Sequence, residues 1–132
     1  MNNDAISAAI TTIRNANMKR KTMIRIPATI MTKRIVQILL KEGFLRDVAE
    51  HEENKKEFLD ISLKHSGKKK DPYITAINRI SKPGLRIYSD HRKITKVLSG
   101  MGIAILPTSC GLITDREARQ KKIGGEVLCH VW

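Results

Sequence analysis

The chain has 132 residues, of which 41% are hydrophobic, so it can bury a core and does not have the composition of a disordered protein. Its formal net charge of +12 predicts a polyanionic partner, either a nucleic acid or an anionic membrane surface. A nucleic acid is favoured, because the cations are spread over predicted loops and helix ends, whereas a membrane-surface helix would concentrate them opposite an apolar face.

The N-terminal part of the chain predicts a helix that buries one narrow stripe. Ile6, Ile10 and Ile13 recur at helical spacing. Asn3 or Asp4 is a plausible start signal for this helix.

A short strand and a second helix are predicted next. The strand comprises residues 23–27 and is stopped by Pro27. Thr29 or Thr32 can cap the helix, and Gly43 ends it. Its apolar face would be formed by Ile35, Val36, Ile38 and Leu39.

Two paired strands follow, at residues 44–48 and 57–63. The second alternates apolar and polar residues, as expected for a sheet with one solvated face. Residues 51–56 between the strands predict a solvated hairpin loop.

The second half of the chain predicts short strands separated by turns. Strands are expected at residues 73–80, 85–88, 103–106 and 127–131. A turn at 81–84 and a short helix from Asp90 to Gly100 separate the first three. Thr114 and Glu117 match a capping box that opens a last short helix.

These elements interleave without a regular repeat, which predicts an α+β fold of two small lobes in tandem. Each lobe would hold a mixed or antiparallel sheet with short helices. Residues 66–72 are polar, charged and free of apolar side chains, which favours a lobe boundary there. The predicted lobes are therefore residues 1–66 and 67–132.

An enzyme has little support in the sequence. Residues 100–102 form a GxG fragment, but it precedes a predicted strand instead of following one. Residues 67–68 lack the upstream glycine and the following Ser or Thr of a P-loop. The four histidines show no ligand spacing, and Ser109, Cys110 and His130 are weak support for a nucleophile and base. No cofactor is expected.

Cys110 and Cys129 are too far apart for a CxxC pair, and no second pair completes a zinc site. A reducing compartment is the simplest interpretation. The N-terminus lacks the features of a secretory signal and of a transit peptide, so we expect the chain to work where it is made. No apolar run approaches the roughly 20 residues that span a bilayer.

Several features favour RNA as the nucleic acid. Basic clusters at residues 19–21 and 68–70 can follow phosphates. Thr108, Ser109 and Gly111 combine hydroxyls with close backbone approach, which suits the minor groove of duplex RNA, although an ordinary tight hairpin remains an alternative. Aromatic residues are only 4% of the chain, which argues against base-stacking sheets. No zipper or zinc-finger spacing supports DNA.

Four motifs in order carry a resemblance to a known family. They lie at residues 80–88, 108–111, 114–119 and 124–129. The chain resembles, over its whole length, the eighth protein of the bacterial-type small ribosomal subunit. This resemblance implies direct binding to the central domain of small-subunit rRNA, a role in its assembly, and contact with neighbouring small-subunit proteins.

The resemblance assigns the main contacts to the C-terminal lobe. The implied RNA-binding residues there are Arg86, Tyr88, Thr108, Ser109, Gly111, Arg116, Gly124, Gly125 and Glu126. In the N-terminal lobe they are Arg14, Thr29 and Lys33, which would serve the phosphate backbone. The chain departs from the family's usual hydroxyl or cationic residues at Ala28, Ile30, Pro107 and Cys110.

The terminal Trp132 and the Ile- and Lys-rich composition resemble plastid-encoded members of this family. The expected location is therefore the ribosome of the chloroplast stroma, with the bacterial cytoplasm as the alternative. The alternative function is translational repression, in which the protein binds an mRNA mimic of the rRNA site. Both functions would use the same surface of the protein.

Overall fold

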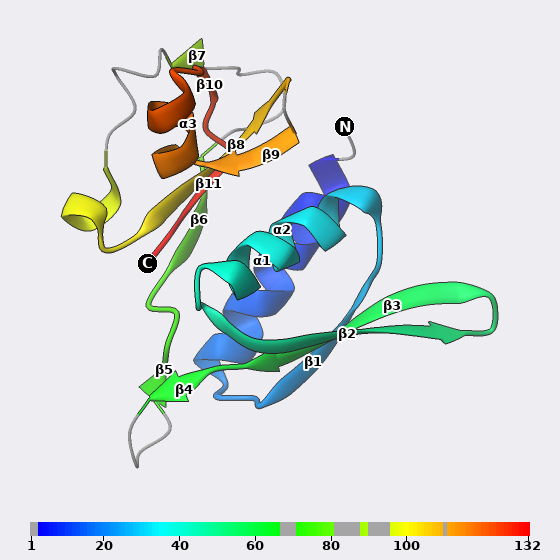
Figure 1. The fold of residues 1–132 in the computed structure, drawn as a ribbon. Helices are drawn as coiled ribbons and strands as arrows, with labels where there is room; N and C mark the ends of the chain where they lie inside the picture. Colours follow the sequence, from blue (N-terminus) through cyan, green and yellow to red (C-terminus); the bar gives the residue numbers. More distant parts are fainter. Residues whose placement is uncertain (1–2, 67–70, 81–87, 90–95, 110) are drawn as a thin grey trace. The chain divides into compact units, whose positions relative to one another are not determined.

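The computed structural model describes residues 3–66, 71–80, 88–89, 96–109 and 111–132. The chain divides into two compact units, Met1–Ile74 and Thr75–Trp132 (Figure 1). The first holds a three-stranded antiparallel sheet and the second a four-stranded one, each with helices. The α+β fold expected from the sequence is thus confirmed. The division between the units falls after the polar segment 66–72.

Two helices pack on one face of the sheet in unit 1 (Figure 1). They are α1 (Asn3–Met18) and α2 (Ile30–Lys41). The predicted stripe of Ile6, Ile10 and Ile13 is fully buried on α1. On α2 the buried apolar residues are Ile35, Val36 and Leu39, while the predicted Ile38 is only partly buried.

The sheet of unit 1 has the strand order β1-β3-β2. Its strands are β1 (Met23–Pro27), β2 (Leu45–Glu53) and β3 (Lys56–Leu63), and a two-stranded ribbon of β4 (His65–Ser66) and β5 (Asp71–Pro72) follows. Ile24 pairs with Ile61, and Ile26 with Leu59, so the buried residues of β1 and β3 face the helices together. The alternation predicted for β3 is confirmed.

The predicted hairpin loop at residues 51–56 is wrong. Strands β2 and β3 continue through it to a two-residue turn at Asn54 and Lys55, and the hairpin extends beyond the helices (Figure 1). Both turn residues have positive φ, 53° and 64°, as a type I′ turn requires, and Asn is favoured in such turns. Charged side chains do not end a strand whose two faces are both solvated, and Glu53 pairs with oppositely charged Lys56.

Unit 2 is built around a sheet with the order β6-β11-β8-β9. Its strands are β6 (Ile77–Arg79), β8 (Ile103–Thr108), β9 (Gly111–Thr114) and β11 (Cys129–Val131), and a separate ribbon pairs β7 (Tyr88–Ser89) with β10 (Gly125–Glu126). Helix α3 (Asp115–Lys121) covers β8 and β9 (Figure 1). Ala104, Leu106, Ile113 and Ala118 form the core between them.

Three strands predicted in this half need correction. The strand expected at residues 73–80 comprises only 77–79, because the N–H groups of Thr75 and Ala76 donate to the carbonyl of Trp132. The strand expected at 127–131 is interrupted before β11, because Leu128 bonds to Ile105 and Ile80 instead. Of the strand expected at 85–88, only Tyr88 lies in the described chain, where it begins β7.

The helix expected between Asp90 and Gly100 is described only at its end. Residues 90–95 and the turn at 81–84 lie outside the described residues. Val97–Gly100 forms a single 3₁₀ turn, η1. Gly100 has a φ of 95°, which a residue with a side chain rarely adopts, so the predicted glycine stop is confirmed.

Threonine residues cap helices α2 and α3 at the predicted positions. Thr29 caps α2 and forms a complete capping box with Thr32. Thr114 caps α3, where its hydroxyl accepts the Glu117 N–H at 3.3 Å. The Glu117 carboxylate lies 3.5 Å from the Thr114 hydroxyl. The start predicted for the last helix is therefore confirmed, but the predicted capping box is only half formed, because the Glu117 carboxylate contacts the Thr114 hydroxyl and not its backbone N–H.

Thr114→Ala should lower the free energy of unfolding of unit 2 by about 0.5–2 kcal/mol, because it removes the side-chain cap of α3. Urea unfolding followed by fluorescence of Trp132, the single tryptophan, reports on this unit because the ring packs against its core. Thr11→Ala, at an exposed position within α1, is the matched control and should cost nothing. Equal unfolding curves for the two variants would contradict the role given to the cap.

Candidate nucleic-acid interface

The predicted hydroxyl loop is a tight β8-β9 hairpin. Thr108 pairs with Gly111 in the strand register, which leaves residues 109–110 as the turn. Gly111 has a φ of 93°, so glycine is required there. The Thr108 hydroxyl donates to the Gly111 carbonyl at 2.9 Å and ties the two strands together, whereas Ser109 is exposed. Cys110 lies outside the described residues.

The predicted glycine corner lies against this hairpin. A Cβ atom built on Gly125 would lie 3.3 Å from Thr108 Cγ2 and 3.4 Å from the Pro107 carbonyl oxygen. A side chain at this position would have to displace its neighbours, so glycine permits the close approach of β10 to β8. Residues separated by seventeen positions in the sequence, Thr108 and Gly125, therefore meet in one place.

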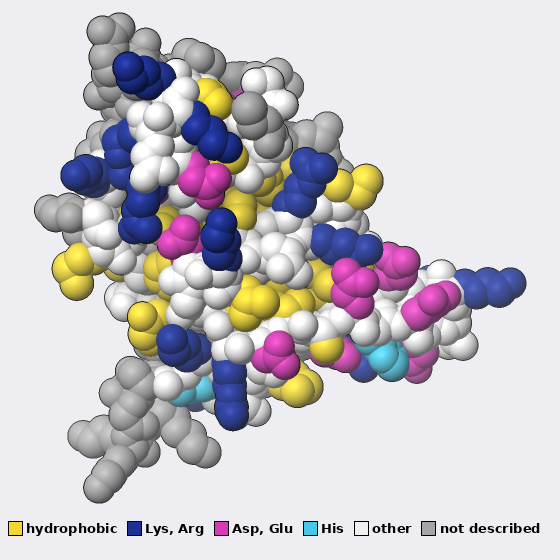
Figure 2. All heavy atoms as spheres, in the orientation of Figure 1, with side chains coloured by type: hydrophobic (Ala, Val, Ile, Leu, Met, Phe, Trp, Pro, Cys, Tyr) yellow, Lys and Arg dark blue, Asp and Glu magenta, His cyan; other side chains and the backbone are white. Residues whose placement is uncertain are grey.

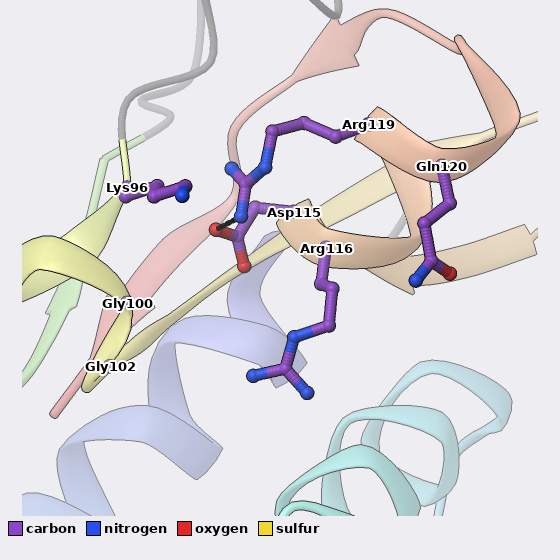
Figure 3. Close-up of a pocket in the computed structure, with 7 residues that line it drawn as sticks. All are labelled: Lys96, Gly100, Gly102, Asp115, Arg116, Arg119 and Gln120. Atoms are coloured by element: carbon purple, nitrogen blue, oxygen red, sulfur yellow. Dashed lines mark ion pairs between the residues drawn. The ribbon is translucent and has the colours of Figure 1, made fainter.

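A third predicted segment joins the same surface through the backbone. In the β7-β10 ribbon Tyr88 pairs with Glu126, and Ser89 pairs with Gly125. The structure thus brings together Tyr88, Thr108, Ser109, Gly111, Gly125 and Glu126, and Gly124 directly precedes β10. Arg86 lies outside the described residues. Arg116 is exposed on α3, where it lines a pocket whose walls do not include the hairpin residues (Figure 3).

The predicted residues of unit 1 already have intramolecular partners. Thr29 uses its hydroxyl to cap α2. The Lys33 ammonium lies 3.0 Å from Glu57 Oε2 and 4.0 Å from Glu50 Oε1. The hydrogen bond to Glu57 and the charges of both carboxylates raise the pKa of Lys33. Its charge is thus partly neutralised before any RNA arrives. Arg14 is half-buried on α1.

Charge is distributed unevenly on the surface. Acidic side chains gather over the β2-β3 hairpin, while cations surround α3 (Figure 2). In unit 1 Arg25 is held by Asp60 at 2.8 Å and by Glu53 at 3.0 Å. The exposed cations of unit 2 include Lys96, Arg116, Lys121 and Lys122. The hairpin and glycine corner belong to the same unit as these four cations.

The thiol of Cys129 is not a nucleophile. It is fully buried, and burial raises its pKa to about 12, so it stays protonated at neutral pH. Within the described ranges, no group of His, Cys, Asp and Glu side chains could hold a metal ion. In the same part of the chain, no helix has the length and apolar character needed to cross a membrane.

Comparison with known proteins agrees with the resemblance found in the sequence. A family model described as ribosomal protein S8 matches residues 4–132. Proteins named small ribosomal subunit protein uS8c are 66% identical in Adiantum capillus-veneris, 61% in Angiopteris evecta and 59% in Pinus thunbergii, each over 132 residues and 100% of both chains. The chain belongs to the ribosomal protein S8 family.

Proposed function

We propose that this protein is a structural component of the plastid small ribosomal subunit that binds the central domain of small-subunit rRNA and supports its assembly. The observation that carries this proposal is the family match over residues 4–132, together with full-length similarity to uS8c proteins. A ribosomal protein family also agrees with the prediction that the chain is not an enzyme.

The hairpin and glycine corner of unit 2 are proposed to read the shape of the RNA. Duplex RNA presents 2′-hydroxyls in a shallow minor groove, where short hydroxyl side chains and backbone groups can pair with them. Ser109 is exposed at the hairpin turn and is suited to this contact. Thr108 acts by tying the hairpin together. Tyr88, Gly124 and Glu126 are proposed as further contacts of the same surface, and Arg86 is proposed as a further RNA-binding residue.

Unit 1 is proposed to supply weaker backbone contacts through Arg14, Thr29 and Lys33. The ion pairs of Lys33 with Glu57 and Glu50 must weaken before this lysine can neutralise a phosphate. Its contribution to RNA affinity should therefore be smaller than that of an unpaired lysine.

An RNA pull-down from plastid extract, followed by sequencing, tests the proposed function. We expect enrichment of the central domain of small-subunit rRNA. Enrichment of one messenger in place of rRNA would instead support a translational repressor, and an absence of enriched RNA would contradict both.

Ser109→Ala should weaken binding to an rRNA fragment by about 1–3 kcal/mol at both low and high salt, because the lost contact is a hydrogen bond with a buried RNA group. Lys21→Ala, at an exposed site, should lose most of its effect at high salt, where counterion release contributes less. Ser62→Ala, on β3 of unit 1, makes the same chemical change and should bind normally. If Ser109→Ala also binds normally, the hairpin is an ordinary turn.

Gly125→Ala should weaken RNA binding while unit 2 stays folded, because the new methyl group pushes β10 away from Thr108 and Pro107. Forcing a methyl group into such a contact costs about 1–3 kcal/mol. Adding Thr108→Ser removes the nearest atom, Cγ2, and keeps the hydroxyl, so the double variant should recover affinity. Affinity unchanged by Gly125→Ala alone would show that the close approach is irrelevant to binding.

A further inference from the structure

A pocket of about 210 Å³ lies beside α3 in unit 2 (Figure 3). Cationic side chains, two glycines and one buried carboxylate line it. Since a water molecule in the liquid occupies about 30 Å³, the pocket has room for a small anionic group.

The carboxylate in this pocket is neutralised by the protein itself. Asp115 is 2% exposed, and its Oδ1 accepts the Ala104 N–H at 3.1 Å. Its Oδ2 accepts from Arg119 Nη2 at 2.8 Å. With both oxygens occupied, Asp115 holds Arg119 in place and offers little repulsion to a bound anion. Arg119 Nη1 is buried and has no hydrogen-bond partner among the described residues, so a nearby negative charge would lower the cost of its burial.

Two further cations line the pocket. Lys96 and Arg116 are exposed, and neither forms an ion pair within the described chain. In Figure 3 the Lys96 side chain points toward the Asp115–Arg119 pair, and Arg116 extends from the start of α3 on the other side of Asp115. An anion in this pocket would therefore have three cationic groups along its walls, and within the described ranges only Arg119 is already ion-paired.

Two glycines, Gly100 and Gly102, form part of the pocket wall. A Cβ atom on Gly102 would lie 2.6 Å from the Val131 carbonyl oxygen, so only glycine fits at that position. The positive φ of 95° at Gly100 also favours glycine. The wall beside the cations is therefore bare backbone at these two positions.

We propose that this pocket binds one backbone phosphate of the RNA, as a second contact of unit 2 in addition to the hairpin and glycine corner. Arginine and lysine side chains suit a phosphate, because the guanidinium offers several N–H donors and the ammonium a compact charge. The proposal rests on the proposed function, since the phosphate belongs to the RNA that the protein binds.

Phosphate-ethylation interference on an rRNA fragment tests this directly, since ethylation removes the charge of one phosphate at a time. Wild-type protein should show interference at one phosphate that disappears in the Lys96→Gln/Arg116→Gln double variant. The double variant should lower the magnitude of the log–log salt slope by about one, because both cations serve a single phosphate. Asp115 and Arg119 are left unchanged to preserve the fold.

Lys121→Gln/Lys122→Gln is the matched control, because it removes the same charge from exposed positions of α3 and its C-cap outside the pocket. It should keep the full interference pattern. If the pocket variant also keeps the full pattern, the pocket binds no phosphate, while the proposed function stands. If wild-type protein fails to bind the fragment at every salt concentration tested, the proposed function itself is wrong.

Discussion

The candidate RNA surface depends on a close approach at a position where a side chain would crowd its neighbours. Gly125 lets β10 approach Thr108 and Pro107 so closely that a Cβ atom would lie at 3.3–3.4 Å from them. Strand β7 pairs with β10 and is thereby brought to the same place. Three segments that are distant in the sequence thus form one surface through main-chain packing, and short side chains such as Ser109 become useful because the backbone itself can approach an RNA groove.

The total charge of the chain is a poor guide to where RNA binds. Arg25 and Lys33 in unit 1 are engaged by Asp60, Glu53, Glu57 and Glu50, and these interactions raise the pKa of both cations. Such exposed pairs add little stability, but they reduce the charge available to a phosphate. Among the described residues that line the pocket at α3, Asp115 is the only carboxylate, and it is buried and engaged, so Lys96 and Arg116 have no acidic partner in that part of the chain.

Local sequence patterns predicted the elements that depend on local physics. The helical spacing of Ile6, Ile10 and Ile13, the strand stopped by Pro27, and the threonine caps at Thr29 and Thr114 all act over a few residues. The pairing of β2 with β3 is predicted correctly, but the extension of both strands to the turn is not, because charged residues were taken as a loop although Asn54 is a signal for a tight turn. The hydrogen bonds from the Thr75 and Ala76 N–H groups to the Trp132 carbonyl join distant parts of the sequence, so no local pattern predicts them.

The family motifs predicted which residues bind RNA, and the structure shows which of these residues lie close together. The proximity of Gly125 to Thr108 depends on strand packing and cannot be inferred from spacing. The same is true of the pocket at α3, because Lys96 is twenty positions before Arg116. Conversely, motif matching does not reveal that Lys33 is ion-paired or that the Thr108 hydroxyl is used within the hairpin.

Hydrogen exchange of the full chain, measured free and bound to an rRNA fragment, tests the central claim most directly. We predict that binding slows exchange at backbone amides of residues 88–89, 108–111 and 124–126 together, while the amides of the β2-β3 turn at 54–55 are unchanged. Protection confined to unit 1, with Ser109 and Gly125 exchanging as in the free protein, would contradict the assignment of the RNA-reading surface to unit 2.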